Sequence, residues 1–247
     1  MAAFLITLSG WSQTCLVREM VQERVNEKGE SKEKATYAFS YYEDNTLKEI
    51  KIENDYPENN ISKDNTNTLK FEKIPLGTKI TWFWNGEYDT HFVLTSNSFL
   101  EFDGDDENDL DTENADEYLL TYEEGKLIYD EDSGITNTWE GGLVTKSKKV
   151  GRKTTWTTTY EYADIPNPFF NFHELGIIDI SVSNFIPFFY TLSSKLWISE
   201  ETTATKEGVE VAYDKEDKYN HTTNKNGCVE QFVVQERIDK VIFTFKY

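Results

Sequence analysis

Four aromatic residues stand beside polar side chains and could bind a ligand. Trp82, Trp84 and Tyr88 gather around one Asn-Gly turn, and Trp139 stands apart. Exposed rings beside acids and amides form platforms for sugar rings, because a ring offers a flat apolar face while polar groups bond to hydroxyls. The alternative is that Trp82 and Trp84 share the buried face of a strand, with Phe83 on the opposite face.

A run of alternating acidic residues could bind a metal ion. Calcium prefers several oxygen ligands on a flexible loop. The run lacks a glycine at the sixth position and a bidentate glutamate at the twelfth, so a solvated acidic loop is the competing interpretation. The candidate calcium ligands are Asp103, Asp105, Glu107, Asp109 and Asp111.

The sequence contains no pattern that is typical of a catalytic site. The three histidines, His91, His173 and His221, are scattered and the cysteines are far apart, which disfavours zinc. There is no Gly-x-Ser-x-Gly elbow and no phosphate-binding loop. A carboxylate pair for glycoside hydrolysis arises by chance among 45 acidic residues, so it indicates little. We therefore expect no enzymatic activity and, calcium aside, no cofactor.

Two cysteines, Cys15 and Cys228, lie near opposite ends of the chain. In a reducing compartment they would be separate buried thiols. In an oxidising compartment they could form one disulfide that ties the start of the chain to a late strand. Cys15 is also a candidate for lipidation, although the residues before it lack the usual small apolar run.

The net charge is −20, from 25 basic and 45 acidic residues. This excess repels phosphate backbones, so we expect no nucleic-acid partner. It also argues against attachment to an anionic membrane by a basic patch. No stretch reaches the roughly 18 apolar residues that a transmembrane helix requires.

The elements that must position these residues are strands. Large side chains alternate with their neighbours on both sides of short polar breaks, which is typical of hairpins with one covered face. Short links place neighbours in sequence side by side and antiparallel. We predict an all-β meander curled towards a barrel, with strands at 15–25, 36–42, 47–53, 68–74, 79–84, 91–95, 99–103, 117–123, 126–130, 143–149, 153–162, 194–199, 209–213, 229–236 and 240–247.

One segment departs from this alternation. Pro166 and Pro168 lack donors for a sheet ladder, so a strand should end there. Between residues 169 and 190 the apolar residues are dense and irregularly spaced. We predict short helical turns and a loop within about 165–190 that cap the core, since these apolar residues would form an aggregation-prone patch if they were exposed. A partner or ligand surface is the alternative.

Several short phrases occur along the chain in a distinctive order. They are Cys15-Leu16-Val17, Tyr37-x-Phe39-x-Tyr41, Leu47-x-x-Ile50, Tyr118-x-Leu120-x-Tyr122, Trp139-x-Gly141-Gly142-Leu143 and Tyr160-x-Tyr162 before Asn167-Pro168. Together they resemble a family of gut-bacterial secreted proteins of unknown function with a porin-like fold and strand phrases similar to YD-type repeats. The resemblance covers the chain from about residue 15 to residue 247. It implies an exported antiparallel β protein, often a lipoprotein, and implies no established activity or catalytic residue.

These observations favour a secreted or periplasmic protein with a structural or binding role. Residues 1–14 are either a signal-peptide remnant or a first strand, and residues 15–247 are expected to form a single β-meander domain. One alternative is a glycan-binding module of a nutrient-uptake system. Another is an outer-membrane β-barrel, because apolar residues alternate up to the C-terminal Tyr247. A glycan or a protein is the expected kind of partner, and the pattern leaves the oligomeric state open.

Overall fold

The computed structural model describes residues 15–55, 65–102, 106–124, 126–130, 134–172, 193–207, 209–235 and 239–247. In these ranges two short 3₁₀ helices, η1 (Thr112–Asn114) and η2 (Pro168–Phe172), interrupt the strands. Within the described ranges, the strands are β1 (Glu19–Val25), β2 (Ser31–Tyr41), β3 (Leu47–Asp55), β4 (Asn65–Ile74), β5 (Gly77–Trp84), β6 (Glu87–Leu94), β7 (Ser98–Phe102), β8 (Asp116–Glu123), β9 (Lys126–Asp130), β10 (Ile135–Glu140), β11 (Leu143–Val150), β12 (Thr154–Pro166), β13 (Lys195–Lys206), β14 (Val209–Thr223), β15 (Val229–Gln235) and β16 (Lys240–Lys246).

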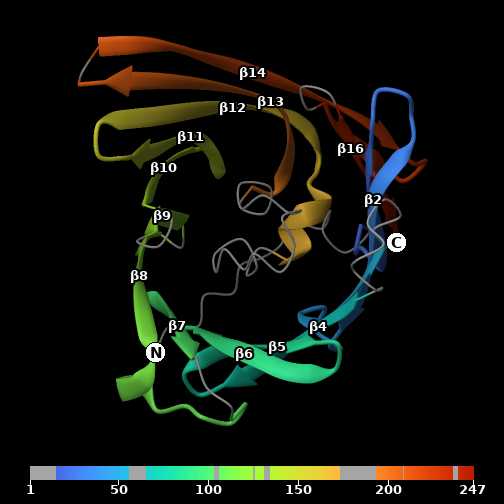
Figure 1. The fold of residues 1–247 in the computed structure, drawn as a ribbon, viewed down its shortest axis with the longest axis vertical. Helices are drawn as coiled ribbons and strands as arrows, with labels where there is room; N and C mark the ends of the chain where they lie inside the picture. Colours follow the sequence, from blue (N-terminus) through green and yellow to red (C-terminus); the bar gives the residue numbers. More distant parts are fainter. Residues whose placement is uncertain are drawn as a thin grey trace.

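The strands form an antiparallel meander that closes on itself (Figure 1). Each strand pairs with the strands before and after it in sequence, and β1 pairs with both β2 and β16. The predicted all-β meander is therefore confirmed. Because successive strands run in opposite directions, their connections alternate between two rims of the barrel. Within the described residues, no helix is long and apolar enough to cross a membrane.

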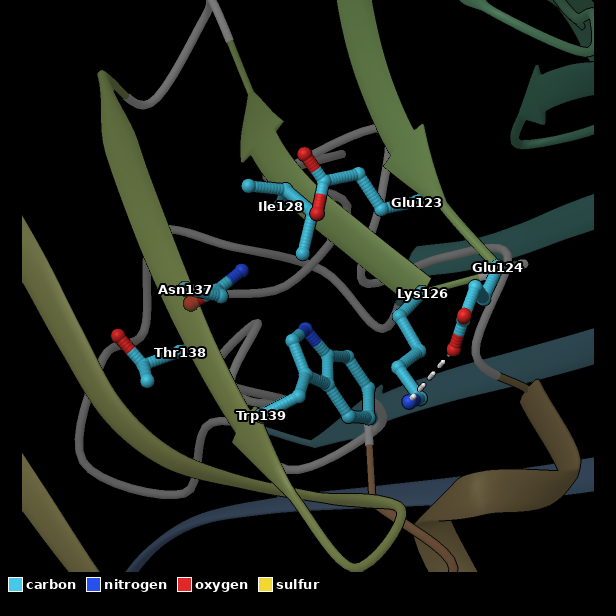
Figure 2. Close-up of a pocket in the computed structure, with 7 residues that line it drawn as sticks. All are labelled: Glu123, Glu124, Lys126, Ile128, Asn137, Thr138 and Trp139. Atoms are coloured by element: carbon cyan, nitrogen blue, oxygen red, sulfur yellow. Dashed lines mark ion pairs between the residues drawn. The ribbon is translucent and has the colours of Figure 1, made fainter.

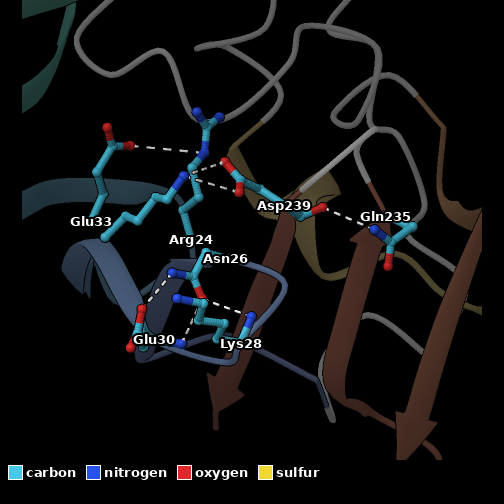
Figure 3. Close-up of polar contacts among 8 residues, drawn as sticks. Arg24, Asn26, Lys28, Glu30, Glu33, Gln235 and Asp239 are labelled. Atoms are coloured by element: carbon cyan, nitrogen blue, oxygen red, sulfur yellow. Dashed lines mark hydrogen bonds and ion pairs between the residues drawn. The ribbon is translucent and has the colours of Figure 1, made fainter.

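Polar contacts hold the seam where the two ends of the chain meet (Figure 3). The Lys32 ammonium lies 3.1 Å from a carboxylate oxygen of Asp239. The Gln235 side chain donates to the Asp239 carbonyl oxygen over 3.0 Å. On β1, Arg24 lies 3.9 Å from the Glu33 carboxylate of β2. The Lys32–Asp239 pair connects the first hairpin to the residue before the last strand, and the other two contacts brace each side of the seam.

The inner face of the barrel is apolar because the registers of neighbouring strands agree. Residues paired across a ladder share a face, so alternation within each strand becomes continuous rows across the sheet. One inward row consists of Phe39, Ile50, Leu69 and Trp82, and most of its members are fully buried. The neighbouring row, Ala38, Lys51, Thr68 and Phe83, faces outward.

The short helix η2 lies inside the ring, where it fills part of the core (Figure 1). Phe169 is fully buried, and its ring meets three core phenylalanines edge to face at 5.2–5.8 Å, namely Phe232, Phe243 and Phe245. Asn167 positions the helix, because its side chain accepts from the Phe169 amide and donates to the Ser193 carbonyl. The predicted aromatic cap is present as far as residue 172; residues 173–192 lie outside the described part.

A disulfide joins Cys15 to Cys228, with 5.5 Å between the two Cα atoms. It connects the segment before β1 to the turn between β14 and β15, and the two cysteines are 213 positions apart in the sequence. Both residues are buried. Since the sulfur of Cys15 is bonded to Cys228, it has no valence left for the acyl-bearing thioether that lipidation of this residue would require. Residues 1–14 lie outside the described part of the chain.

A second, smaller apolar cluster lies on the outer face. Val93, Leu100 and Phe102 pack there, away from the main core. The acidic segment from residue 106 to residue 115 passes beside them, and Ala115 packs against the cluster. The Lys79 ammonium donates to the Glu107 carbonyl oxygen. The acidic segment is exposed, as predicted, but it is also fixed to the barrel.

His91 is the second anchor of this segment. Its ring is fully buried and stacks on Phe102 at 4.5 Å. Its Nε2 lies 2.7 Å from the Asp109 carbonyl oxygen, so this nitrogen must carry a hydrogen. Its Nδ1 then accepts from the Tyr88 hydroxyl over 2.8 Å. Burial, and secondarily the Lys79 ammonium, lower the pKa of His91, which favours this neutral form.

Loss of the disulfide should destabilise the barrel. In the chain-entropy model, a loop of this length contributes about 5 kcal/mol, and removal of a native disulfide typically costs about 2–5 kcal/mol. Urea unfolding of the Cys15→Ser/Cys228→Ser variant should therefore show a lower midpoint than the oxidised wild type. Thiol titration of unfolded, non-reduced protein should find no thiol; two reactive thiols would contradict the bond.

Acidification should weaken the barrel through His91. Its pKa is lowered on folding, so below about pH 6.5 the unfolded chain binds more protons. The His91 contribution to stability is thus complete above that pH and declines as the pH falls towards the lowered pKa of the folded state. Replacing His91 by Gln should flatten the change in free energy of unfolding between pH 7 and pH 5. His221→Gln, on β14, is the matched control, and equal slopes for His91→Gln and wild type would refute the account.

Candidate functional site

A pocket of about 430 Å³ opens between the β8–β9 hairpin and β10 (Figure 2). Its volume falls within the range of small-molecule sites. Ring, carboxylate, ammonium, amide and hydroxyl groups all reach it. The lining residues are Glu123, Glu124, Lys126, Ile128, Asn137, Thr138 and Trp139.

Two irregularities in the sheet shape this pocket. The ladder between β8 and β9 shifts register at Thr121/Tyr122, and the ladder between β10 and β11 shifts at Thr138/Trp139. A bulge adds one residue to one strand and redirects the side chains beside it. The two bulges thus frame the opening, and Trp139 comes directly after one of them.

The turn beside Trp139 explains the Gly-Gly pair that follows it. Gly141 and Gly142 both have positive φ, 58° and 83°. A two-residue hairpin turn of this kind requires a left-handed backbone at both positions, which glycine adopts without strain. The turn therefore brings β11 back along β10 immediately after Trp139 and Glu140.

Hydrogen bonds fix the position of the Trp139 indole ring. Its Nε1 donates to the Leu127 carbonyl oxygen over 2.9 Å. The Asn137 side chain donates to the same oxygen over 3.3 Å, and its own oxygen accepts from the Ser147 hydroxyl over 2.7 Å. Asn137 and Ser147 are buried, whereas Trp139 is only half-buried. The ring is thus positioned by hydrogen bonds and keeps part of its surface for contact.

Lys126 is the cation of the pocket. Its ammonium lies 3.7 Å from the Glu124 carboxylate, and Figure 2 shows its side chain extending alongside the Trp139 ring. The Glu124 side chain is 88% exposed, so the pair is solvated and weak. Glu123 adds a second exposed carboxylate at the opening. The arrangement can accept and donate hydrogen bonds around a flat apolar face.

Partly buried tyrosines pack against the core behind this part of the sheet. Burial, and secondarily the nearby Asp130, raise the pKa of Tyr122 to about 12. The Tyr162 hydroxyl donates to the Val144 carbonyl oxygen over 2.7 Å and lies 3.0 Å from the Ser193 hydroxyl. Both phenols stay protonated at neutral pH, and that of Tyr162 donates to the backbone of β11.

The structure does not bring the four predicted aromatic residues together. Trp82 packs against the main core, donates to Asn67 over 3.2 Å and meets Trp84 edge to face at 6.3 Å. Trp84 is 43% exposed at the end of β5. Tyr88 lies on the outer face with Phe83 and His91. Trp139 stands on β10, four strands beyond β6.

The predicted calcium ligands are engaged in local turns where the structure describes them. Asp109 accepts from the Asp111 amide and Asp111 accepts from the Glu113 amide, over 2.9 and 3.1 Å. Asp103 and Asp105 lie outside the described part of the chain. Within the part that is described, no group of three or more metal-binding side chains comes together.

Sequence reasoning identified Trp139 and missed the residues around it. Glu123, Glu124 and Lys126 were visible only as a polar hairpin turn, and β10, which carries Asn137 and Thr138, was not predicted. The Gly-Gly pair after Trp139 was the available signal, since it indicates a tight turn that requires a strand on each side. The pairing of β9 with β10 then completes the pocket.

Comparison with solved structures identifies proteins with a similar fold. No family model matches the chain, and no curated protein matches it. Among solved structures, it is similar to a porin-like protein from Bacteroides uniformis ATCC 8492, with a TM-score of 0.53, 13% identity, and 93% of this chain and 98% of that chain covered. A porin-like protein from Bacteroides vulgatus ATCC 8482 aligns with a TM-score of 0.40, 9% identity, and 94% and 98% coverage. The chain therefore has a porin-like fold, which confirms the resemblance at the level of architecture.

Proposed function

We propose that this chain is a non-enzymatic, extracytoplasmic binding protein whose pocket beside Trp139 holds a saccharide. The observation that carries the proposal is the Trp139 indole, which is fixed by a hydrogen bond to Leu127 and still presents surface to a polar pocket. A core tryptophan would be enclosed by apolar side chains. Here the residues that line the pocket together with Trp139 are two acids, an amide, a hydroxyl, an ammonium and one apolar residue, Ile128.

The chemistry of the pocket matches a sugar ring. A pyranose has an apolar face of C–H groups and a rim of hydroxyls, so it needs a flat ring on one side and paired donors and acceptors at the edge. Trp139 supplies the ring. Carboxylates accept from hydroxyls, and Lys126 and Thr138 donate. Because both acids are exposed, the pocket favours neutral or cationic sugars over acidic ones.

The carboxylates give less support to a glycoside hydrolase. Such an enzyme needs two carboxyl groups that face each other across the bond to be cleaved, one of them in an enclosed setting as the acid. Glu123 and Glu124 are adjacent in sequence and exposed, and Glu124 pairs with Lys126. We therefore propose binding without turnover.

The disulfide supports an extracytoplasmic location. Disulfides persist in the periplasm and at the cell surface and are rare in reducing compartments. A bond that joins the start of the described chain to the β14–β15 turn could hardly form by chance proximity in an unfolded state. The porin-like fold is consistent with such a location.

The outward-facing side chains favour an aqueous setting over the outer-membrane alternative. A membrane barrel presents an apolar band to lipid, and a Lys at the bilayer midplane costs about 2–4 kcal/mol. On β3 the outward residues are charged, because Lys51, Glu53 and Asp55 alternate with the buried Ile50 and Ile52. The apolar face of this barrel points inward.

Trp139 provides the direct test of this function. Binding to a glycan array should identify neutral or amino sugars, and titration calorimetry should show that Trp139→Ala weakens binding about tenfold or more through loss of the stacking face. Trp139→Phe should keep most of the affinity, because it retains a ring. Trp84→Ala, an exposed tryptophan outside the pocket, is the matched control. Equal affinity of wild type and Trp139→Ala would overturn the assignment, as would a wild type that binds no glycan.

A further inference from the structure

The hairpins β11–β12 and β13–β14 end side by side on one rim of the barrel. Thr154 on β12 pairs with Lys206 on β13, and the Glu207 amide donates to the Lys153 carbonyl oxygen over 3.3 Å. Strands β12, β13 and β14 are long, with 13, 12 and 15 residues, and Figure 1 shows their hairpins extending at the upper left of the ring. The tips of the two hairpins thus form one continuous surface.

This surface combines exposed apolar and basic side chains. Val150 is 63% exposed and Val209 is 68% exposed, the two largest values among the big apolar residues that the structure describes. One valine stands at each tip. Exposed lysine and arginine side chains surround them. We call these residues the hairpin-tip surface: Lys149, Val150, Arg152, Lys153, Lys206 and Val209.

The charge of this region is opposite to that of the chain. From residue 141 to residue 160 there are five basic residues and no acidic residue, so this segment carries +5 within a chain of net charge −20. Within the described residues, no ion pair links the four cations of the hairpin-tip surface to an acid. Two exposed acids, Glu207 and Glu210, adjoin it at the second tip and reduce its net charge.

We propose that the hairpin-tip surface docks on an anionic lipid bilayer. Peripheral proteins bind such membranes by placing small apolar groups at the boundary of the headgroups while nearby lysines and arginines meet the anionic lipids. A soluble polyanion would use the cations and leave the valines exposed to water. The presence of both kinds of group at two adjacent tips therefore favours a membrane.

The net negative charge of the chain does not prevent this contact. At physiological ionic strength the Debye length is about 8 Å, so acids on distant faces are screened from a membrane at the tips. At about 3.3 Å per residue, the 13 residues of β12 extend roughly 43 Å, several times that length. The expectation drawn from total charge treats the surface as uniform, whereas the segment from residue 141 to residue 160, which contains the tip of the β11–β12 hairpin, carries five basic residues and no acidic residue.

Co-sedimentation with vesicles tests the proposal on the whole chain. The protein should bind vesicles of phosphatidylcholine and phosphatidylglycerol at 50 mM salt, bind pure phosphatidylcholine at least about tenfold more weakly, and dissociate at 500 mM salt. Reversing the charge of Lys149, Arg152 and Lys153 to Glu should lower the partition coefficient about tenfold or more. Val150→Asp/Val209→Asp should lower it as well, because the apolar contact is lost.

Matched variants distinguish docking at the hairpin-tip surface from an effect of the protein's total charge. A triple reversal of Lys48, Lys51 and Lys225, exposed residues away from the hairpin tips, changes the net charge equally and should leave binding unchanged. Leu76→Asp, an exposed apolar residue on another turn, controls for the valines. Far-ultraviolet dichroism verifies that every variant is folded. Absence of vesicle binding, or equal losses in the control triple, would overturn the proposal. Full competition by dextran sulfate together with an unaffected valine variant would instead assign the surface to soluble polyanions.

Discussion

The structure depends on the inward burial of alternate side chains in a sheet whose ladder closes. Because β1 pairs with β16, the sheet has one inner and one outer face and no free edge. Each residue of a strand therefore belongs either to the core or to the surface. Inward rows such as Phe39, Ile50 and Leu69 exclude water together, while the outward rows carry charge.

The closed sheet also explains where specialised features occur. A regular ladder leaves little freedom for a side chain, so a pocket needs a local departure from regularity. Bulges at Thr121/Tyr122 and Thr138/Trp139 provide that departure and expose part of the Trp139 ring. The outer cluster of Val93, Leu100 and Phe102 is another exception, and the segment fixed by Lys79 and His91 adjoins it.

Alternating connections give the two rims different chemistry. The pocket involves the β8–β9 turn and the end of β10 beside the β10–β11 turn, and the disulfide reaches the β14–β15 turn; all three turns lie on one rim. The β11–β12 and β13–β14 turns lie on the other. A ligand at the first rim and a membrane at the second could therefore be engaged together.

The parts of the fold that the sequence predicted are those in which alternation is strong. The hairpin predicted at 36–42 and 47–53 corresponds to β2 and β3, since large apolar residues alternate at Tyr37, Phe39 and Tyr41 and again at Ile50 and Ile52. Strand β14 was predicted to end at residue 213 but continues to Thr223, because pairing with β13 and β15 overrides a polar sequence. Strand β10 was missed because Asn137 occupies a buried position that alternation assigns to an apolar residue.

The candidate site was less predictable than the fold. Trp139 was noted for its type, but the same reasoning selected Trp82, which packs against the core. Exposure of an aromatic ring depends on bulges and on neighbours from other strands, and neither is encoded in a local pattern. The pairing of Cys15 with Cys228 was left open for the same reason, because sequence gives no distance between them.

Amide hydrogen exchange at the seam tests the closed, inward-facing sheet most directly. If β1 and β16 pair with each other as well as with β2 and β15, amides that alternate along both strands should be protected to a similar degree as those of β3. An open sheet would leave every second amide of β1 and β16 without a partner. Rapid exchange at those alternate positions, with slow exchange in β3, would contradict the account.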